Sequence, residues 1–330
     1  MALTHRPMTP GDVRECVEII AKHPVIGPRY GSAIADLRAA WLKLLDCQAR
    51  TATVLMPDDS PRAPICFVGV SVIVTDDFVR EMKTAPLFWI GPELARRIVR
   101  GNSPLLTDKQ LREDNSRGGL NLLVWEGCPS SQFEKDIEVP RYVINLFIED
   151  HKGFLWKEFV ADQAETSEKL RGMFQSGGLL WNPQKHRYIQ GLESDPDEIV
   201  RKPHLVGLTR QIEMDGPNSW TGSWVGSLFH YHPPKCSFSR GEQRMLSKAL
   251  EGWTDEELSE KLATSLPTVK KTWRSIYQRA GARVPGLKPD EPGMNGMETK
   301  RGREKKRRLL TYLRNHPEEL RPFAKGPAGR

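Results

Sequence analysis

The sequence predicts an α/β or α+β domain over residues 1–235, an all-α domain over residues 236–284, and a linker with a basic C-terminal arm over residues 285–330. Three observations predict this division. Runs of β-branched residues alternate with helical patterns in the first part of the chain, which is typical of a mixed α/β domain. Three helix-capping patterns follow one another after residue 238, and proline and glycine then recur from residue 285 to residue 296.

The first domain opens with a short extended piece that leads into helical patterns. Val13, Cys16, Val17 and Ile20 recur at helical spacing, so they share one apolar face. The expected helices of this domain cover residues 13–20, 34–45, 93–99, 107–112 and 153–181.

Strands are expected where β-branched and apolar residues run together. The stretch from Ile65 to Val74 is rich in β-branched residues and predicts a buried strand. The expected strands cover residues 65–74, 120–125, 142–148, 205–214 and 223–231. Because these strands are too far apart for a simple meander, the region predicts a mixed α/β arrangement.

The opening order of a short strand, two helices and then strands resembles the GNAT acyltransferase fold. That family holds the pyrophosphate of acyl-CoA on backbone N–H groups in an Arg/Gln-x-x-Gly-x-Gly/Ala turn before a helix. No matching string occurs in this sequence, since Arg117-Gly118-Gly119 precedes a strand instead of following one. The resemblance therefore implies a fold and not an activity, and we expect no cofactor.

The second domain begins with two capping boxes. Ser239 with Glu242, and Thr254 with Glu257, follow the pattern in which a hydroxyl and a carboxylate satisfy each other's free backbone N–H groups. A third cap, Ser265, comes after only a short turn. These signals predict three consecutive helices, with a tight turn between the second and the third.

The third helix has one apolar face and one cationic face. Its expected buried row is Leu266, Val269, Trp273, Ile276 and Ala280. Another face carries Lys270, Lys271, Arg274 and Gln278, with Pro267 and Thr268 at its N-terminal end. A short helix, a tight turn and a helix of this kind predict a helix-turn-helix, whose second helix fits the major groove of DNA. A three-helix bundle with a solvated basic face is the alternative.

The residues that form these helices also resemble a known family. The matching stretches are residues 238–243, 251–258 and 265–270, together with Ile276. They resemble the LuxR-type helix-turn-helix of transcriptional regulators, over about 45 residues. The resemblance implies that Lys270, Lys271 and Arg274 contact double-stranded DNA, that Thr268 lies near its backbone, and that the protein is a homodimer.

Two departures from the LuxR pattern stand out. Thr272 occupies a position where the family often has His, and Ala280 one where it usually has Leu. In addition, the proline-rich residues 284–289 cannot readily continue as the family's fourth helix, which often forms the dimer contact. The promoter-reading domain of bacterial sigma factors has a similar pattern.

Charge is concentrated in the C-terminal third. Residues 238–284 carry 9 Lys/Arg and 6 Asp/Glu, and residues 291–330 carry 11 and 5, while the whole chain has a net charge of +7. Such a region suits a polyanion. Seven of the nine residues from Lys300 to Arg308 are Lys or Arg, and a short amphipathic helix follows before Pro317. This arm either binds phosphates or docks its helix elsewhere on the protein.

The remaining signals argue against an enzyme or a metalloprotein. The five cysteines are widely spaced, which indicates reduced thiols. His230, His232 and Cys236 lack a partner pair at metal-ligand spacing, so we expect no metal site. We identify no catalytic residues. Because no membrane-length apolar run or signal segment occurs, we expect a cytoplasmic protein.

These observations favour a DNA-binding transcriptional regulator whose N-terminal domain senses a small molecule or mediates assembly. Two alternatives stay open. One is an acyl-CoA-dependent acyltransferase with an attached DNA-binding module, and the other is a sigma-like promoter-recognition subunit.

Overall fold

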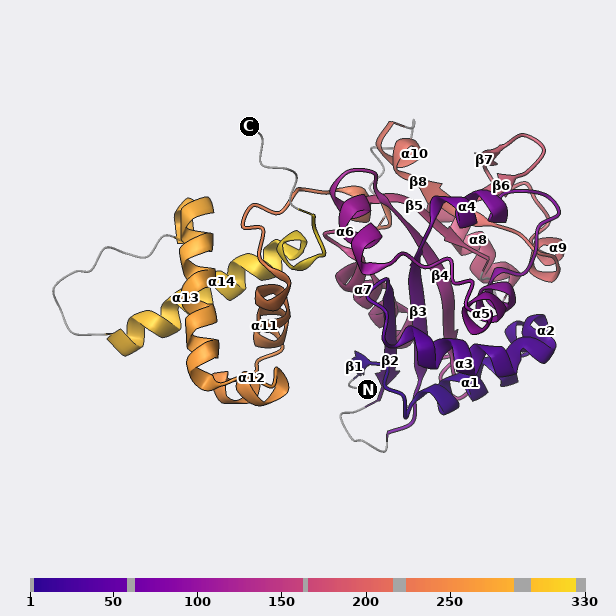
Figure 1. The fold of residues 1–330 in the computed structure, drawn as a ribbon. Coiled ribbons are helices and arrows are strands. Elements are labelled where there is room, and N and C mark those ends of the chain that lie inside the picture. The colour runs from indigo at the N-terminus through magenta and orange to yellow at the C-terminus, as the bar shows by residue number, and fades with distance from the viewer. Residues whose placement is uncertain (1–2, 58–62, 163–165, 216–223, 288–297, 325–330) are drawn as a thin grey trace. The chain divides into compact units, whose positions relative to one another are not determined.

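The computed structural model describes residues 3–57, 63–162, 166–215, 224–287 and 298–324, with the backbone alone for residues 213–215 and 298–303. The chain divides into two compact units (Figure 1). Residues 1–151 and 155–229 form the first, which we call the sheet unit, and residues 152–154 and 230–330 form the second. The described secondary-structure elements of the second are all helical, so we call it the helical unit.

One eight-stranded sheet organises the sheet unit. Its strands lie in the order β1-β2-β3-β4-β5-β8-β6-β7. Their bounds are β1 Thr4–Pro7, β2 Arg50–Met56, β3 Phe67–Val74, β4 Leu120–Pro129, β5 Trp156–Ala161, β6 Leu179–Asn182, β7 Arg187–Ile189 and β8 Val206–Thr209. Among these paired strands only β4 and β5 are parallel, from Leu120 opposite Trp156 to Val124 opposite Ala161.

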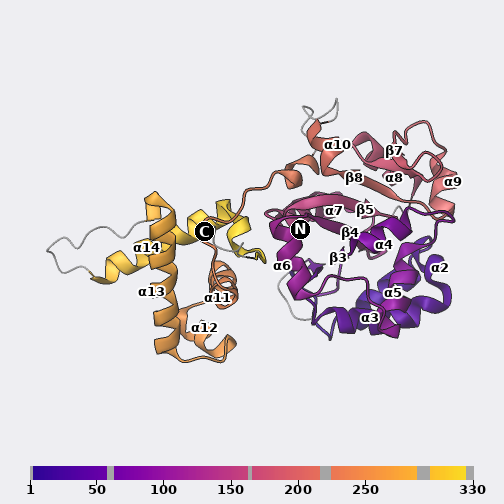
Figure 2. The same ribbon diagram turned by 45° about the horizontal axis from the view of Figure 1, so that its top comes forward.

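Helices cover both faces of this sheet (Figures 1 and 2). They are α1 Val13–Lys22, α2 Ile26–Tyr30, α3 Ile34–Leu44, α4 Asp76–Met82, α5 Ile90–Arg100, α6 Asp108–Ser116, α7 Glu138–His151, α8 Ser167–Gln175, α9 Pro196–Arg201 and α10 Arg210–Asp215. Successive residues of a strand point to opposite faces. Trp125 of β4 accordingly meets Trp41 of α3 edge to face at 6.1 Å, while the preceding residue, Val124, borders a cavity beneath Phe147 of α7. The sheet unit is therefore a mixed α/β structure with its core on both sides of the sheet.

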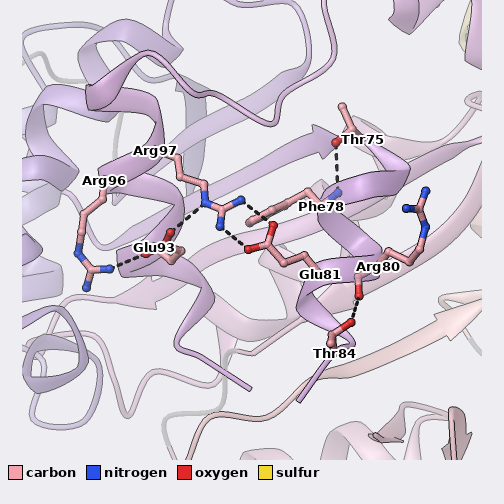
Figure 3. A network of polar contacts seen from close by, with 8 residues as sticks. All are labelled: Thr75, Phe78, Arg80, Glu81, Thr84, Glu93, Arg96 and Arg97. Carbon is pink, nitrogen blue, oxygen red and sulfur yellow. Dashed lines mark hydrogen bonds and ion pairs between the residues drawn. The ribbon is translucent and has the colours of Figure 1, made fainter. Parts of the chain in front are cut away.

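Charged side chains join α4 to α5 at the edge of this core (Figure 3). The Arg97 guanidinium donates to Glu81, with Nη1 2.8 Å from Oε2, and its Nε donates to Glu93 Oε1 at 2.9 Å. The same guanidinium lies 5.1 Å from the ring centroid of Phe78, whose backbone N–H donates to the capping Thr75 hydroxyl. These hydrogen bonds raise the pKa of Arg97 and lower that of Glu81. All the groups are thus partnered within the fold.

Three sequence predictions in the sheet unit are wrong. Residues 142–148 were expected to be a strand and lie in α7, where Val139 and Leu146 are buried and Ile144 is exposed. Residues 156–161 were expected to be helical and form β5, whose side chains are buried on both faces except Lys157. Of the expected strand 223–231, residues 224–231 contain a 3₁₀ turn at Gly226–Phe229, while residue 223 lies outside the described residues.

Other predicted elements are confirmed within a few residues. These are the helices α1, α3, α5 and α6, the strands β3 and β4, and the first half of the expected strand 205–214, which is β8. In the described part of the expected helical stretch 153–181, only Ser167–Gln175 forms a helix, α8, and residues 179–181 lie in β6. The second half of that stretch is α10. Strands β2, β6 and β7 were not predicted. No described helix is both long and apolar enough to span a membrane.

The helical unit has four α-helices among its described residues. They are α11 Arg240–Leu250, α12 Asp255–Lys261, α13 Leu266–Arg283 and α14 Glu298–Asn315, with 3₁₀ turns at Pro285–Leu287 and Pro317–Leu320. Their shared core contains side chains from α11, α12, α13 and α14. Helix α14, which follows residues 288–297, is therefore part of the core of this unit.

Candidate nucleic-acid interface

Helix α11 begins and ends where its capping residues predict. The Ser239 hydroxyl accepts from the Glu242 backbone N–H at 3.3 Å, and the Glu242 carboxylate accepts from the Ser239 N–H at 2.7 Å. Met245, Leu246 and Ala249 are buried on one face of this helix. The chain then leaves the helix through Gly252, whose φ of 96° suits a residue without a Cβ atom.

Helix α12 and the turn after it set the start of α13. Thr254 and Glu257 form the second capping box, with a Glu257 N–H to Thr254 Oγ1 distance of 3.2 Å. The turn contains Ala263 at a φ of 48°, and the Ser265 hydroxyl then caps α13 by accepting from the Thr268 N–H at 3.3 Å. Only residues 262–265 separate the two helices. All three predicted caps are confirmed.

The buried face of α13 follows the predicted row. Val269, Trp273, Ile276 and Ala280 are buried in the core of the helical unit, and Leu266 is half-buried. The Trp273 indole N–H donates to Asp255 Oδ1 of α12 at 3.1 Å, which fixes the packing of α13 on α12. The helix continues to Arg283, close to residue 284, where the predicted domain ends.

The four site residues named from the sequence all have exposed side chains. They are Thr268, Lys270, Lys271 and Arg274. We call the three cations the basic face, and none of them forms an ion pair with another described residue. Other cations of the helical unit do form ion pairs with residues of the same unit, such as Lys248 with Glu251 at 2.8 Å. The basic face is thus left available for an anionic partner.

The four residues do not form a single cluster. Thr268 and Lys271 line a groove between α11 and α13, together with Arg244 of α11. Lys270 and Arg274 lie one helical turn apart and outside that lining, on a neighbouring strip of the helix. The basic face therefore has two parts, one that lines the groove and one outside it.

Glu242 ties α11 to α13 beside this groove. Its carboxylate is buried and accepts from the Ser275 hydroxyl at 2.8 Å, and it lies 3.4 Å from the Arg279 Nε. Burial alone would raise the pKa of Glu242, but the Ser239 and Ser275 hydrogen bonds and the Arg279 charge outweigh it and lower the pKa. The ionised carboxylate is therefore the form that stabilises the fold.

A pH dependence follows from that lowered pKa. A carboxyl group whose pKa is lower in the folded state stabilises the protein at pH values above its pKa in the unfolded state, which is 4.5 here. This stabilisation is lost as the pH falls below 4.5 and through the folded-state pKa. We expect Glu242→Gln to destabilise the helical unit by about 1 kcal/mol at neutral pH, since it loses an ionised cap. Urea unfolding of both proteins at several pH values measures this. A difference that does not shrink below pH 4.5 would contradict it.

Helix α14 supplies part of the core beneath the basic face. Leu309 and Leu313 are each 1% exposed and pack with residues of α11 and α13. The Lys306 Nζ donates to Asp255 Oδ1 at 3.0 Å and lies 4.9 Å from the centroid of the Trp273 ring. Of the two alternatives for the arm, the docking of its helix on the protein is therefore observed. The expected short length of that helix is corrected, because α14 has 18 residues.

The residues after α14 also form hydrogen bonds with the segment that precedes α11. Glu319 is fully buried, and its carboxylate accepts from the backbone N–H groups of Lys235 and Cys236 at 3.0 Å. The Tyr312 hydroxyl donates to the same carboxylate at 2.8 Å. His230 and His232 are exposed whereas Cys236 is buried, so these three side chains do not converge on one point. No metal-binding group of three or more His, Cys, Asp or Glu residues occurs in the described part of the chain.

The sheet unit contains an apolar cavity of about 280 Å³. It lies where the parallel pairing of β4 and β5 ends, at Val124 and Ala161, and it is covered by Phe147 of α7 and by Met173 of α8. Ligands of α/β proteins bind outside the carboxyl ends of parallel strands. Since the described lining carries no charged side chain, this cavity suits an uncharged apolar molecule.

Buried carboxylates of the sheet unit are used to hold helices. Asp162, at the end of β5, accepts from the Ile90 N–H at the start of α5 at 2.6 Å, and burial raises its pKa to about 6. The Tyr30 hydroxyl donates to Glu126 and accepts from the Trp125 indole at 3.0 Å. These contacts give the carboxylates structural partners.

Comparison with known proteins assigns no family. No family model matches the sequence, and no curated protein matches it. Among solved structures, the chain is similar to a histone acetyltransferase HPA2 and related acetyltransferase from Corynebacterium glutamicum, with 16% identity and a TM-score of 0.33 over 63% of this chain and 95% of that one. It is also similar to an uncharacterized protein from Bacillus halodurans, with 11% identity and a TM-score of 0.33 over 68% and 91%.

These similarities are too low to carry an argument about fold or activity. The mixed α/β class of the sheet unit therefore rests on its own strand order, and the GNAT resemblance stays a prediction.

Sequence reasoning missed two parts of the site. Arg244 was not singled out, although its place two residues after Glu242 in α11 could have been noted. Docking of the C-terminal helix was one alternative, but its place in the core of α11, α12 and α13 was not identified, because the intervening residues 284–297 are rich in proline and glycine. Both depend on contacts between separate segments.

Proposed function

We propose that this protein binds double-stranded DNA through α13 and regulates transcription, as a helix-turn-helix protein of the LuxR type. The observation that carries the proposal is the exposed basic face of α13, presented by a short helix and a four-residue turn. Cations without an ion-pair partner, projected from one side of a helix, suit the acceptor edges of guanine and the phosphates of DNA.

The two parts of the basic face support different roles. Lys270 and Arg274 lie one turn apart, so both can reach base edges when α13 enters the major groove. Lys271 and Thr268 lie on the side that faces α11, where a DNA strand would pass the protein. Base contacts specify the sequence, whereas backbone contacts set the position of the protein.

Selection of bound sequences from random DNA tests the proposal, using the full-length protein. We expect one enriched sequence, and we expect Lys270→Ala or Arg274→Ala each to weaken binding to it by about 1–3 kcal/mol. Thermal unfolding should hardly change, because both side chains are exposed. Lys109→Ala, an exposed cation in the sheet unit, removes the same charge and serves as the control. Equal effects of all three variants would contradict a role for α13 in base readout.

The sheet unit would then hold the regulating ligand. The apolar cavity between α7, α8 and the sheet supports this, because its described lining suits a small uncharged molecule. A homodimer is also part of the proposal, since paired half-sites increase the affinity of helix-turn-helix proteins for DNA. Analytical ultracentrifugation of the protein with and without its selected DNA measures whether it is a monomer or a dimer.

The acyltransferase alternative has one observation against it. Residues 130–137, which lead from the end of β4 into α7, contain no glycine and carry Glu134, Lys135 and Asp136, a net charge of −1. Acidic side chains oppose the pyrophosphate of acyl-CoA, which is usually held on free N–H groups at a helix start. We expect no binding of acetyl-CoA in calorimetric titration, and micromolar affinity would favour the alternative. The sigma-like alternative would require binding to RNA polymerase, which a pull-down with purified polymerase tests.

A further inference from the structure

A groove with polar and apolar lining lies between α11 and the first half of α13, and its apolar side chains include Met245, Leu262 and Val269. It has a volume of about 500 Å³. Its polar lining comes from both helices and from the turn before α13, and comprises Ser239, Glu242, Arg244, Thr264, Thr268, Lys271, Thr272 and Ser275. Thr268, Lys271, Thr272 and Ser275 are spaced by three, one and three residues, so they form one strip along α13.

The net charge available in this groove is positive. Arg244 and Lys271 are exposed, and neither forms an ion pair or hydrogen bond with another described residue. Glu242 is the acidic residue of the described lining, but it is 5% exposed and its carboxylate is already bound by Ser239, Ser275 and Arg279. Two cations therefore remain for a molecule that enters the groove.

An anion with several oxygen acceptors fits this lining. A guanidinium presents paired N–H donors that match a phosphate, and an ammonium group adds a second positive charge. The half-buried Thr264 side chain places a hydroxyl group beside the two cations, whereas the Thr268 hydroxyl already pairs with Ser265 Oγ at 2.9 Å. A carboxylate ligand would satisfy fewer of these donors than a phosphate.

We propose that this groove seats a phosphate of the DNA backbone, held by Arg244 of α11 and Lys271 of α13. The proposal rests on the proposed function, and it extends the interface from α13 to a second helix. The strip with Lys270 and Arg274 reads bases, while the groove clamps the strand that runs along the edge of the same major groove. Because the clamp bridges two helices, it also fixes the angle at which α13 enters the DNA.

The salt dependence of binding tests this assignment. Removing one phosphate contact reduces the slope of log affinity against log salt concentration by about 1. We expect Arg244→Gln and Lys271→Gln each to reduce the slope by about 1, and to weaken binding to selected and random DNA by the same factor. Lys270→Gln is the matched variant on the other strip, and it should change the preferred sequence.

Several outcomes separate the proposal from the function on which it rests. If wild-type protein shows no preference for any DNA, the proposed function fails. If Lys270→Gln alters the preferred sequence while Arg244→Gln leaves the salt slope unchanged, only the phosphate site fails. If Arg244→Gln changes the preferred sequence, the groove contacts bases and the assignment is overturned. Arg244→Lys keeps the charge, so it should restore most of the slope.

Free phosphate is the other source of the same chemistry. Inorganic phosphate should raise the thermal stability of the wild-type protein little, and much less than a DNA duplex does. Strong stabilisation by phosphate alone, abolished in Arg244→Gln together with an unchanged DNA salt slope, would mean that the groove binds a small anion instead.

Discussion

Replacing Leu309 and Leu313 of α14 with alanine is expected to unfold the helical unit while the sheet unit stays folded. Both side chains are 1% exposed and lie in the core that α11, α12 and α13 share. Each such truncation costs about 2–5 kcal/mol, and the whole stability of a domain is about 5–15 kcal/mol. Hydrogen exchange measured peptide by peptide should show loss of protection in α11 and α13.

The matched control lies on the exposed side of the same helix. Thr311 and Arg314 are exposed, so a variant with both changed to alanine should keep its protection. Protection of α11 and α13 that survives the leucine variant would show that α14 is not part of the core. Because α14 packs in the core, deletion of the C-terminal arm would also destabilise the helical unit. Removing residues 299–330 takes away the core side chains Leu309 and Leu313, so such a deletion cannot test whether Lys300 to Arg308 bind phosphates.

The substitution Trp273→Ala is expected to lower the free energy of unfolding of the helical unit by about 3–5 kcal/mol. The indole is 5% exposed, stacks on Tyr277 with the ring centroids 5.6 Å apart, and donates to Asp255. Its loss leaves a cavity beneath the basic face. Urea unfolding followed by far-ultraviolet circular dichroism measures the change.

Two further variants show which part of the indole matters. Trp273→Phe keeps most of the buried area and loses the hydrogen bond to Asp255, so it should cost less than Trp273→Ala. Trp253 is half-buried at the margin of the same core, and Trp253→Ala should also cost less. A Trp273→Ala protein as stable as Trp253→Ala would contradict the central place of Trp273.

The parts of the site that were predictable from sequence are those fixed by neighbours in the chain. Ser239 with Glu242 and Thr254 with Glu257 act over three residues, and the row from Val269 to Ala280 needs only the helical repeat. The groove and the docking of α14 depend on segments far apart in sequence. Nothing within the stretch 298–315 itself shows that Leu309 meets α11.

The same limit explains the errors in the sheet unit. The run from Tyr142 to Ile148 contains aromatic and β-branched residues that favour strands, yet α7 forms because burying Val139 and Leu146 on the sheet outweighs local propensity. Residues 156–161 lack clear alternation because β5 is covered on both faces. Short apolar runs of this kind cannot be assigned to helix or strand from periodicity alone.

Because α14 is part of the core, the helical unit cannot complete its core until the ribosome has synthesised α14. Leu313 is added 75 residues after Phe238, which lies in the same apolar cluster. At about 5–20 residues per second, the ribosome needs roughly 4–15 s to make that stretch. During those seconds α11, α12 and α13 are already synthesised, but their apolar sides lack the leucines that cover them. We therefore expect the nascent chain to depend on a chaperone that shields this surface until α14 emerges.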